Sequence, residues 1–266
     1  MPPNFIDMKN ALCTLLFWHL VLTQLMGQTT AELPPSKPVH SLSLGVGLSH
    51  TALKTEVISP LIFSGTGIPL SLTYRRENAV LKSYFQLQYQ TPTLNSPFDF
   101  RMNALDAFLT NGVLRKVKSF NKMNLYVGCE IQLMGSFRQM PKVVNNDQVI
   151  MLMGLNLSSI LQYSLGKHLL EAQASIAVLG YNYRAKDNLK IGAFEKTFSE
   201  FLRSEAYFET LPKYLNTSLR LSYVPPLKSQ HFRWRVDYWG NFQRFNQRQY
   251  MGVLQNQITT FLTYQF

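Results

Sequence analysis

The chain has 266 residues with a formal net charge of +11, and 46% of its residues are hydrophobic, 15% charged and 13% aromatic. Beyond the N-terminal leader, no uninterrupted apolar run reaches the roughly 18 residues of a membrane-spanning helix, which argues against a helical membrane protein. The balance suits a soluble all-β protein, and equally a barrel whose two faces meet lipid and water, because alternation averages the hydropathy out.

The N-terminus has the pattern of a secretory signal peptide. Lys9 precedes an apolar core, Ala11–Met26, and the small residue Gly27 follows it. This order of positive, apolar and small residues predicts a signal peptide over 1–27, cleaved after Gly27. A membrane anchor is the alternative, and it is disfavoured because the run is short and contains polar residues.

Cysteine usage excludes a disulfide framework. Cys13 lies in the leader, which leaves Cys129 as the single cysteine of the mature chain. An exported protein with one cysteine cannot form an intramolecular disulfide. Removing the leader leaves the net charge unchanged, and in an exported protein we expect the basic balance to favour anionic lipid or glycan over nucleic acid.

After a proline-rich stretch, Leu33–Pro38, residues of alternating polarity continue almost to the end of the chain. A period of two predicts strands whose faces have different environments. We expect ten: 41–50, 68–76, 79–90, 107–119, 122–138, 149–164, 168–183, 214–225, 231–245 and 250–266.

The phase of each strand separates an apolar face from a polar one. In 122–138 the apolar phase includes Cys129 and the polar phase includes Glu130. In the final stretch, "ITTFLTYQF", one face ends in Tyr264 and Phe266 while the other is mostly polar. Rings near strand ends fall on the apolar phase, namely Phe232, Trp234, Tyr163, Tyr223 and Tyr74. Alternation alone would also fit a soluble sandwich.

The connections differ in length in a regular way. Those at 77–78, 120–121, 165–167 and 226–230 are short. Those at 51–67, 91–106, 139–148 and 184–213 are long, and 246–249 is the exception. Short turns on one rim and long loops on the other are typical of an up-and-down transmembrane barrel.

Taken together, the signal peptide, the ten amphipathic strands and the terminal Tyr-Gln-Phe resemble Gram-negative outer-membrane β-barrel proteins. The resemblance implies an antiparallel up-and-down transmembrane barrel of about ten strands, with twelve possible, over 41–266, after a periplasmic segment over 28–40. It also implies a location in the cell outer membrane, contact with outer-membrane lipid and lipopolysaccharide, and assembly by the barrel-assembly machinery. That machinery would read Tyr264 and Phe266 as the C-terminal signal.

Charges of both signs fall on the inward phase and are expected to form a network in the lumen. They are Glu130, Glu171, Asp237, Arg75, Lys82, Arg138, Arg220, Arg233 and Arg235. A ten-stranded barrel lies near the size that side chains fill, so ion pairs that satisfy one another would plug it. The excess of positive groups leaves a narrow anion-favouring passage as the alternative.

Catalysis has weak support. Barrel lipases resemble one another in a His-x-Ser pair on a strand, which this sequence lacks, and a nucleophilic serine needs a base beside it. Barrel proteases need paired acids at the outer rim, and Asp99 and Asp106 fall in the expected outer loop 91–106, where turn roles are commoner. The sequence predicts no catalytic residue, metal site or cofactor, and no nucleic-acid partner.

The longest outer connection, 184–213, carries apolar residues at helical spacing, which predicts an amphipathic helix near 188–206. Its apolar face would comprise Ile191, Phe194, Phe198, Phe201 and Leu202. Such a face could cap the barrel mouth, lie in the outer leaflet or bind a protein partner.

The sequence therefore favours a non-catalytic barrel that acts at the cell surface as a binding, accessory or structural subunit, with a largely plugged lumen. The first alternative is a porin-like, narrow, anion-favouring solute channel. The second is an outer-membrane lipid hydrolase or protease.

Overall fold

The computed structural model describes residues 38–55, 59–141, 148–184, 206–210, 213–226, 229, 231–246 and 250–266. All regular elements in these ranges are strands of one sheet. They are β1 (Val39–Thr55), β2 (Ser59–Gly67), β3 (Leu70–Glu77), β4 (Leu81–Gln90), β5 (Thr93–Asn95), β6 (Arg101–Phe120), β7 (Met123–Gln139), β8 (Gln148–Leu165), β9 (His168–Arg184), β10 (Ala206–Thr210), β11 (Tyr214–Val224), β12 (Phe232–Phe245) and β13 (Met251–Gln265). No helix in the described ranges combines the length and the hydropathy needed to cross a membrane.

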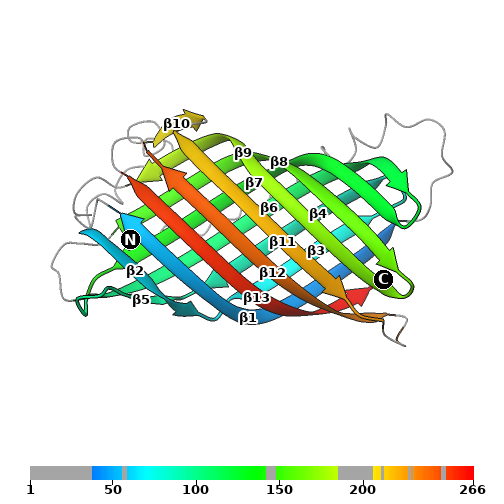
Figure 1. Ribbon diagram of the computed structural model, residues 1–266, viewed down its shortest axis with the longest axis horizontal. Coiled ribbons are helices and arrows are strands. Elements are labelled where there is room, and N and C mark those ends of the chain that lie inside the picture. The colour runs from blue at the N-terminus through cyan, green and yellow to red at the C-terminus, as the bar shows by residue number, and fades with distance from the viewer. Residues whose placement is uncertain are drawn as a thin grey trace, which may run out of the picture.

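The sheet closes on itself as a cylinder. Neighbouring strands are antiparallel in the order β13-β12-β11-β9-β8-β7-β6-β4-β3-β1, and β13 returns to pair with β1 from Ser41↔Gln265 to Thr55↔Met251. Closure leaves these ten strands without a free edge along their paired lengths. Figure 1 shows them strongly tilted around the cylinder. The predicted ten-stranded antiparallel barrel is confirmed.

Three short strands extend one end of the cylinder. β2 pairs with the last part of β1, β5 joins β2 to β6, and β10 pairs with β9. Pro69 and Pro92 separate β2 from β3 and β4 from β5, since proline cannot donate to a strand ladder. The sequence prediction placed these three strands within the long connections 51–67, 91–106 and 184–213.

The two ends of the barrel differ. At the end called here the turn end, the connections are tight and Phe266 lies beside the start of β1. The side chain of Asn78 accepts hydrogen bonds from the N–H groups of Val80 and Leu81, and Asn121 and Gly166 take positive φ values of 46° and 61°. The opposite end, called the loop end, carries β2, β5 and β10 (Figure 1).

Exposure alternates along the strands as the sequence predicts. On β13, Leu262 and Tyr264 are exposed, whereas Phe261 and Thr263 are buried inside the barrel. Phe232, Trp234 and Tyr223 likewise lie on the outer face. Cys129 shares the outward phase of β7 and is partly exposed, with a free thiol.

The interior is divided into two halves of different character. The turn half is mostly polar and charged, apart from a small buried cluster of Tyr84, Leu114, Tyr126 and Ile160. The loop half holds a buried apolar cluster that the sequence analysis did not anticipate, because it expected a polar inner face throughout. Its members include Leu53, Phe63, Leu94, Met102, Phe108, Met134, Ile150, Leu152, Tyr214, Trp239, Phe245, Met251 and Val253.

Candidate functional site

The turn half of the lumen contains a compact ionic cluster. Glu171 on β9 lies 3.0 Å from the guanidinium of Arg75 on β3 and 2.5 Å from the ammonium of Lys82 on β4. Glu77 approaches the same two cations at 4.0 and 3.7 Å but is more exposed. Lys82 also lies over the ring of Tyr126, 4.7 Å from its centroid. The cluster joins walls that face each other, because β3 and β9 are five strands apart in the cylinder of ten.

A second ion pair lines the mouth at the turn end. Arg235 and Asp237 share the inner face of β12, 3.0 Å apart, and the Arg235 guanidinium stacks on the ring of Phe261 at 4.1 Å. Phe261 covers Gly45, where a Cβ would come within 2.5 Å of the ring. A cavity of about 70 Å³ lies here, and Arg233 lines it while remaining exposed.

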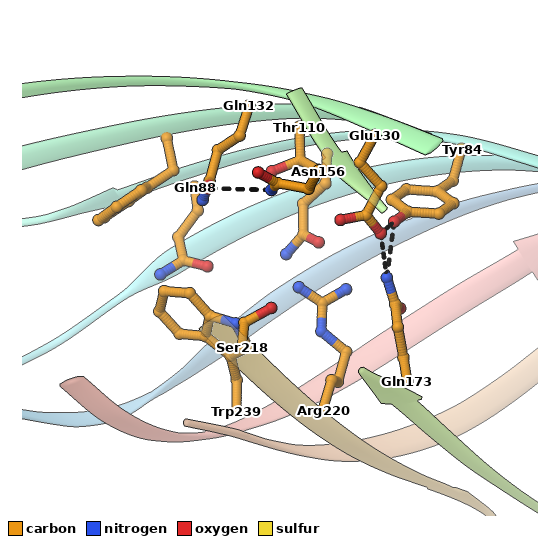
Figure 2. A pocket seen from close by; sticks show the side chains of 12 residues that line it. Tyr84, Gln88, Thr110, Glu130, Gln132, Asn156, Gln173, Ser218, Arg220 and Trp239 are labelled. Atoms are coloured by element: carbon orange, nitrogen blue, oxygen red, sulfur yellow. Dashed lines mark hydrogen bonds between the residues drawn. The ribbon is translucent and has the colours of Figure 1, made fainter. Parts of the chain in front are cut away.

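Glu130 is the centre of a hydrogen-bond network in the middle of the barrel. Its carboxylate accepts hydrogen bonds from the hydroxyl of Tyr84, the amide of Gln173 and the hydroxyl of Ser175 at 2.9 Å. Tyr84 lies over Gly112 on the neighbouring strand, in space that any other side chain would need. Figure 2 shows Glu130, Tyr84 and Gln173 meeting at one end of a cavity of about 30 Å³.

Arg220 on β11 projects into the same cavity between Trp239 and Gln173 (Figure 2). It faces Trp239 directly across the β11–β12 ladder. Among the described residues, its guanidinium makes no hydrogen bond or ion pair. Arg220 therefore differs from Arg75, Lys82 and Arg235, which all have carboxylate partners.

Asp106 and Arg138 form a charged pair in the loop half of the lumen. The sequence analysis placed Asp106 in an outer loop. Asp106 lies on β6, completely buried, and accepts hydrogen bonds from Arg138 at 3.0 Å and Ser136 at 2.7 Å. The expectation that it belongs to an outer loop was wrong, because β6 begins at Arg101. The signal was available: Met102, Ala104, Asp106 and Phe108 alternate inward. Asp99 does lie in a turn, with a positive φ of 59°.

Rings also meet across the barrel. Phe108 on β6 and Trp239 on β12 pack edge to face with centroids 5.8 Å apart, although their strands are five apart in the cylinder. Nearby, the amide of Gln88 donates to Gln257 at 2.7 Å and that of Asn216 donates to Gln132 at 2.8 Å. Side chains thus bridge the lumen at several levels along its axis.

The rim at the turn end is aromatic. The backbone of Phe266 exchanges two hydrogen bonds with His40, and the two rings stack at 5.8 Å. Tyr264 packs between Phe266 and Phe232. The imidazoles of His40 and His168 bond to the hydroxyls of Tyr74 and Tyr223 at 2.7 and 2.8 Å, rather than to a serine.

Two further observations concern metal binding and the helix expected in the 184–213 connection. No group of three or more His, Cys, Asp or Glu side chains that could hold a metal ion occurs in the described ranges. The expected helix near 188–206 lies outside the described residues except for Ala206, which begins β10. Its apolar face, which comprises Ile191, Phe194, Phe198, Phe201 and Leu202, lies wholly outside them.

Comparison with known proteins identifies the architecture. No protein-family model and no curated protein sequence matches the chain. Among solved structures, it is similar to the outer membrane protease OmpT from Escherichia coli, with 8% sequence identity, a TM-score of 0.57, and 90% of this chain and 99% of that chain covered.

It also matches the translocator domain of the autotransporter NalP from Neisseria meningitidis, with 10% identity, a TM-score of 0.44, and 98% and 97% of the two chains covered. At such low identity the likeness concerns the fold and no activity. The chain has the fold of an outer-membrane β-barrel.

Proposed function

We propose that this protein is an integral outer-membrane barrel with a closed lumen that serves as a non-catalytic binding, accessory or structural subunit at the cell surface. The observation that carries the proposal is the bridging of opposite walls. Arg75 reaches Glu171 and Phe108 reaches Trp239, each pair across the full width of the cylinder. A conducting pore needs a continuous path wide enough for its solute, and these contacts interrupt it.

The outer face supports a membrane location. Apolar side chains on the outward phase include Leu44, Leu48, Leu157 and Ile258, all more than half exposed, and they would be unstable in water as a continuous surface. In the outer membrane they would face lipid and lipopolysaccharide chains, with the ring cluster of Phe232, Tyr264 and Phe266 at the periplasmic boundary. Export by the 1–27 leader and assembly by the barrel-assembly machinery belong to the same proposal.

Binding at the surface is assigned to the long connection over 184–213. The apolar periodicity of that segment supports a docking role for a protein partner. Catalysis is less favoured, because Asp106, one of the two acids considered for a protease, is buried and bonded to Arg138.

Conductance in planar bilayers tests the closed lumen. We expect no steady open-state current from the purified chain. Combined Phe108→Ala and Trp239→Ala substitutions remove the rings that meet in mid-barrel and should produce intermittent currents. The matched pair Phe232→Ala and Trp234→Ala changes two rings on the outer face and should leave the protein silent.

Steady currents through the unmodified protein would contradict the proposal. If those currents favoured anions over cations, the narrow anion-favouring passage would replace it.

A further inference from the structure

Two basic side chains approach one tyrosine ring on the outer face of the barrel at the loop end. The ammonium of Lys54 on β1 lies 5.8 Å from the centroid of the Tyr250 ring, and the guanidinium of Arg244 on β12 lies 5.9 Å from the same centroid. Lys54 and Arg244 both pair directly with Gly252 of β13, each from a neighbouring strand. Figure 1 shows these three strands side by side. The two cations therefore lie at one level of the barrel.

Gly252 leaves space for the ring between them. A Cβ at this position would lie 2.8 Å from the hydroxyl oxygen of Tyr250 and 3.4 Å from the ring carbon that carries it. Arg244 is oriented by a further contact, because its Nε donates to the Oδ1 of Asn246 at 2.9 Å. That bond leaves the two terminal NH2 groups of the guanidinium for another acceptor.

These two charges have no acidic partner. Among the described residues, no carboxylate forms an ion pair with Lys54 or Arg244, and both residues are exposed. Asp106, the acid of the loop half, lies inside the barrel and is bonded to Arg138. The outer face at this level thus carries two positive charges without an ionic partner in the described chain.

The level of this pair in a bilayer follows from the geometry of β13. Gly252 lies twelve residues before Tyr264, which pairs with Phe232 in the aromatic rim at the turn end. At about 3.4 Å per residue and a strand tilt of about 35–45°, this stretch spans about 30 Å along the barrel axis. The apolar band of a membrane barrel is about 25 Å tall, so the two cations lie just outside the hydrocarbon at the loop end.

We propose that Lys54, Arg244 and Tyr250 bind a phosphate group of a glycolipid in the outer leaflet, namely the phosphorylated headgroup of lipopolysaccharide. The inference rests on the outer-membrane location proposed above. A phosphate carries up to two negative charges and several acceptor oxygens, which matches a guanidinium and an ammonium that share one level. Leu254 and Phe242 pair directly on the turn-end side of Gly252 and are exposed on the outer face, where acyl chains of the same lipid would lie.

Titration with lipid A tests the site. The full chain is refolded in detergent micelles that contain no lipopolysaccharide, and the binding of bisphosphorylated lipid A is measured by native mass spectrometry. We expect saturable binding. Lipid A from which both phosphates have been removed should bind at least about tenfold more weakly, because it lacks the charge-assisted hydrogen bonds.

Substitutions separate these two cations from basic charge in general. Lys54→Gln combined with Arg244→Gln should raise the lipid A concentration for half-saturation at least about tenfold. Lys54→Arg combined with Arg244→Lys keeps both charges and should retain the binding. The matched control, Arg76→Gln combined with Arg115→Gln, removes two exposed basic side chains near the turn end and should leave the titration unchanged.

Equal binding of lipid A and its dephosphorylated form would overturn the proposal, as would equal half-saturation in the two glutamine variants. Competition by glucose 1-phosphate as effective as that by lipid A would contradict a lipid ligand and assign the site to a soluble phosphate. If Lys54→Gln with Arg244→Gln does not fold, as judged by heat-dependent gel mobility, the comparison of the two lipids on the unsubstituted chain decides by itself.

The gel mobility of the unsubstituted chain distinguishes failure of this site from failure of the proposed location. A chain that folds as a heat-modifiable barrel but ignores the phosphates would overturn the site alone. A chain that stays dissolved without detergent would overturn the outer-membrane location and the site together.

Discussion

Glycines inside the barrel make room for aromatic rings on neighbouring strands. Gly45 lies under Phe261, Gly112 under Tyr84 and Gly180 under Tyr214, with a Cβ at each position 2.5 Å from a ring atom. The three glycines have ordinary strand backbones. They matter because they have no side chain, which lets a large ring lie flat against the barrel wall. Two of these rings then serve polar contacts, since Tyr84 donates to Glu130 and Phe261 supports Arg235.

Gly112→Ala tests this arrangement. The new methyl group would meet the ring and hydroxyl of Tyr84 and push them away from Glu130, leaving a buried carboxylate one donor short. We expect a loss of about 1–3 kcal/mol in the free energy of unfolding. Urea unfolding of the barrel refolded in lipid vesicles measures it.

Gly135→Ala is the control. Gly135 lies on the outer face of β7, where a Cβ would meet no atom within 4 Å. Its effect should stay within about 0.5 kcal/mol, as for other substitutions away from packed sites. Equal losses in the two variants would show that the ring over Gly112 does not matter.

Individual charges could be assigned to the lumen from sequence, but their partners could not. The period of two places Glu171 and Arg75 on the inner face, whereas their 3.0 Å contact depends on how ten strands close and stagger. For the same reason nothing in the sequence distinguished Arg220, without a partner in the described chain, from Arg235 beside Asp237.

At the scale of elements, the ten strands of the cylinder were predicted because each has two faces in different environments. The predicted ends of the strands were less accurate where the two faces differ little in polarity. β6 starts six residues earlier than the expected 107–119 strand, in a part where Met102 and Ala104 face inward and the contrast with the outer face is weak. β2, β5 and β10 were missed since prolines or short length break the pattern.

The closing pair of strands supports a prediction about assembly. Ile258 on β13 and Phe266, which directly follows that strand, are on the same outward phase with similar exposure, 58% and 61%. Only Phe266 stacks on His40 and Tyr264 at the end of the ladder. Phe266→Ala should therefore slow closure and lower the amount of folded protein in the outer membrane, measured by heat-dependent gel mobility of membrane fractions.

Ile258→Ala changes a similar apolar area on the same strand and should assemble normally. If both variants reached the membrane in equal amounts, the terminal ring would have no special role in assembly, although the barrel itself could still close.

The whole molecule presents an apolar outer wall, and the exposure of that wall to lipid can be probed at one atom. Cys129 is on the outward phase of β7 and has no disulfide. In vesicles containing the chain without residues 1–27, we expect its thiol to resist a membrane-impermeant maleimide and to react fully after denaturation. Mass spectrometry measures the modified fraction.

Ser119→Cys is the comparison, since Ser119 is exposed near the β6–β7 turn and should react while the barrel is folded. Rapid modification of Cys129 in intact vesicles would place the middle of β7 in water and contradict a lipid-facing wall.

The unequal halves of the interior have a consequence for how each strand selects its register. In the loop half the inner face of β13 carries the apolar residues Met251 and Val253, so a shift by one residue there would replace them with Gly252 and Leu254 and move no charge into lipid. In the turn half the same shift would move Lys82, Glu171 or Arg235 to the outer face, where a basic residue costs about 2–4 kcal/mol at the midplane of a bilayer and less near its boundary. The alignment of β4, β9 and β12, which carry these three residues, is thus decided in the turn half, whereas Asp106 and Arg138 add the same constraint to β6 and β7 in the loop half.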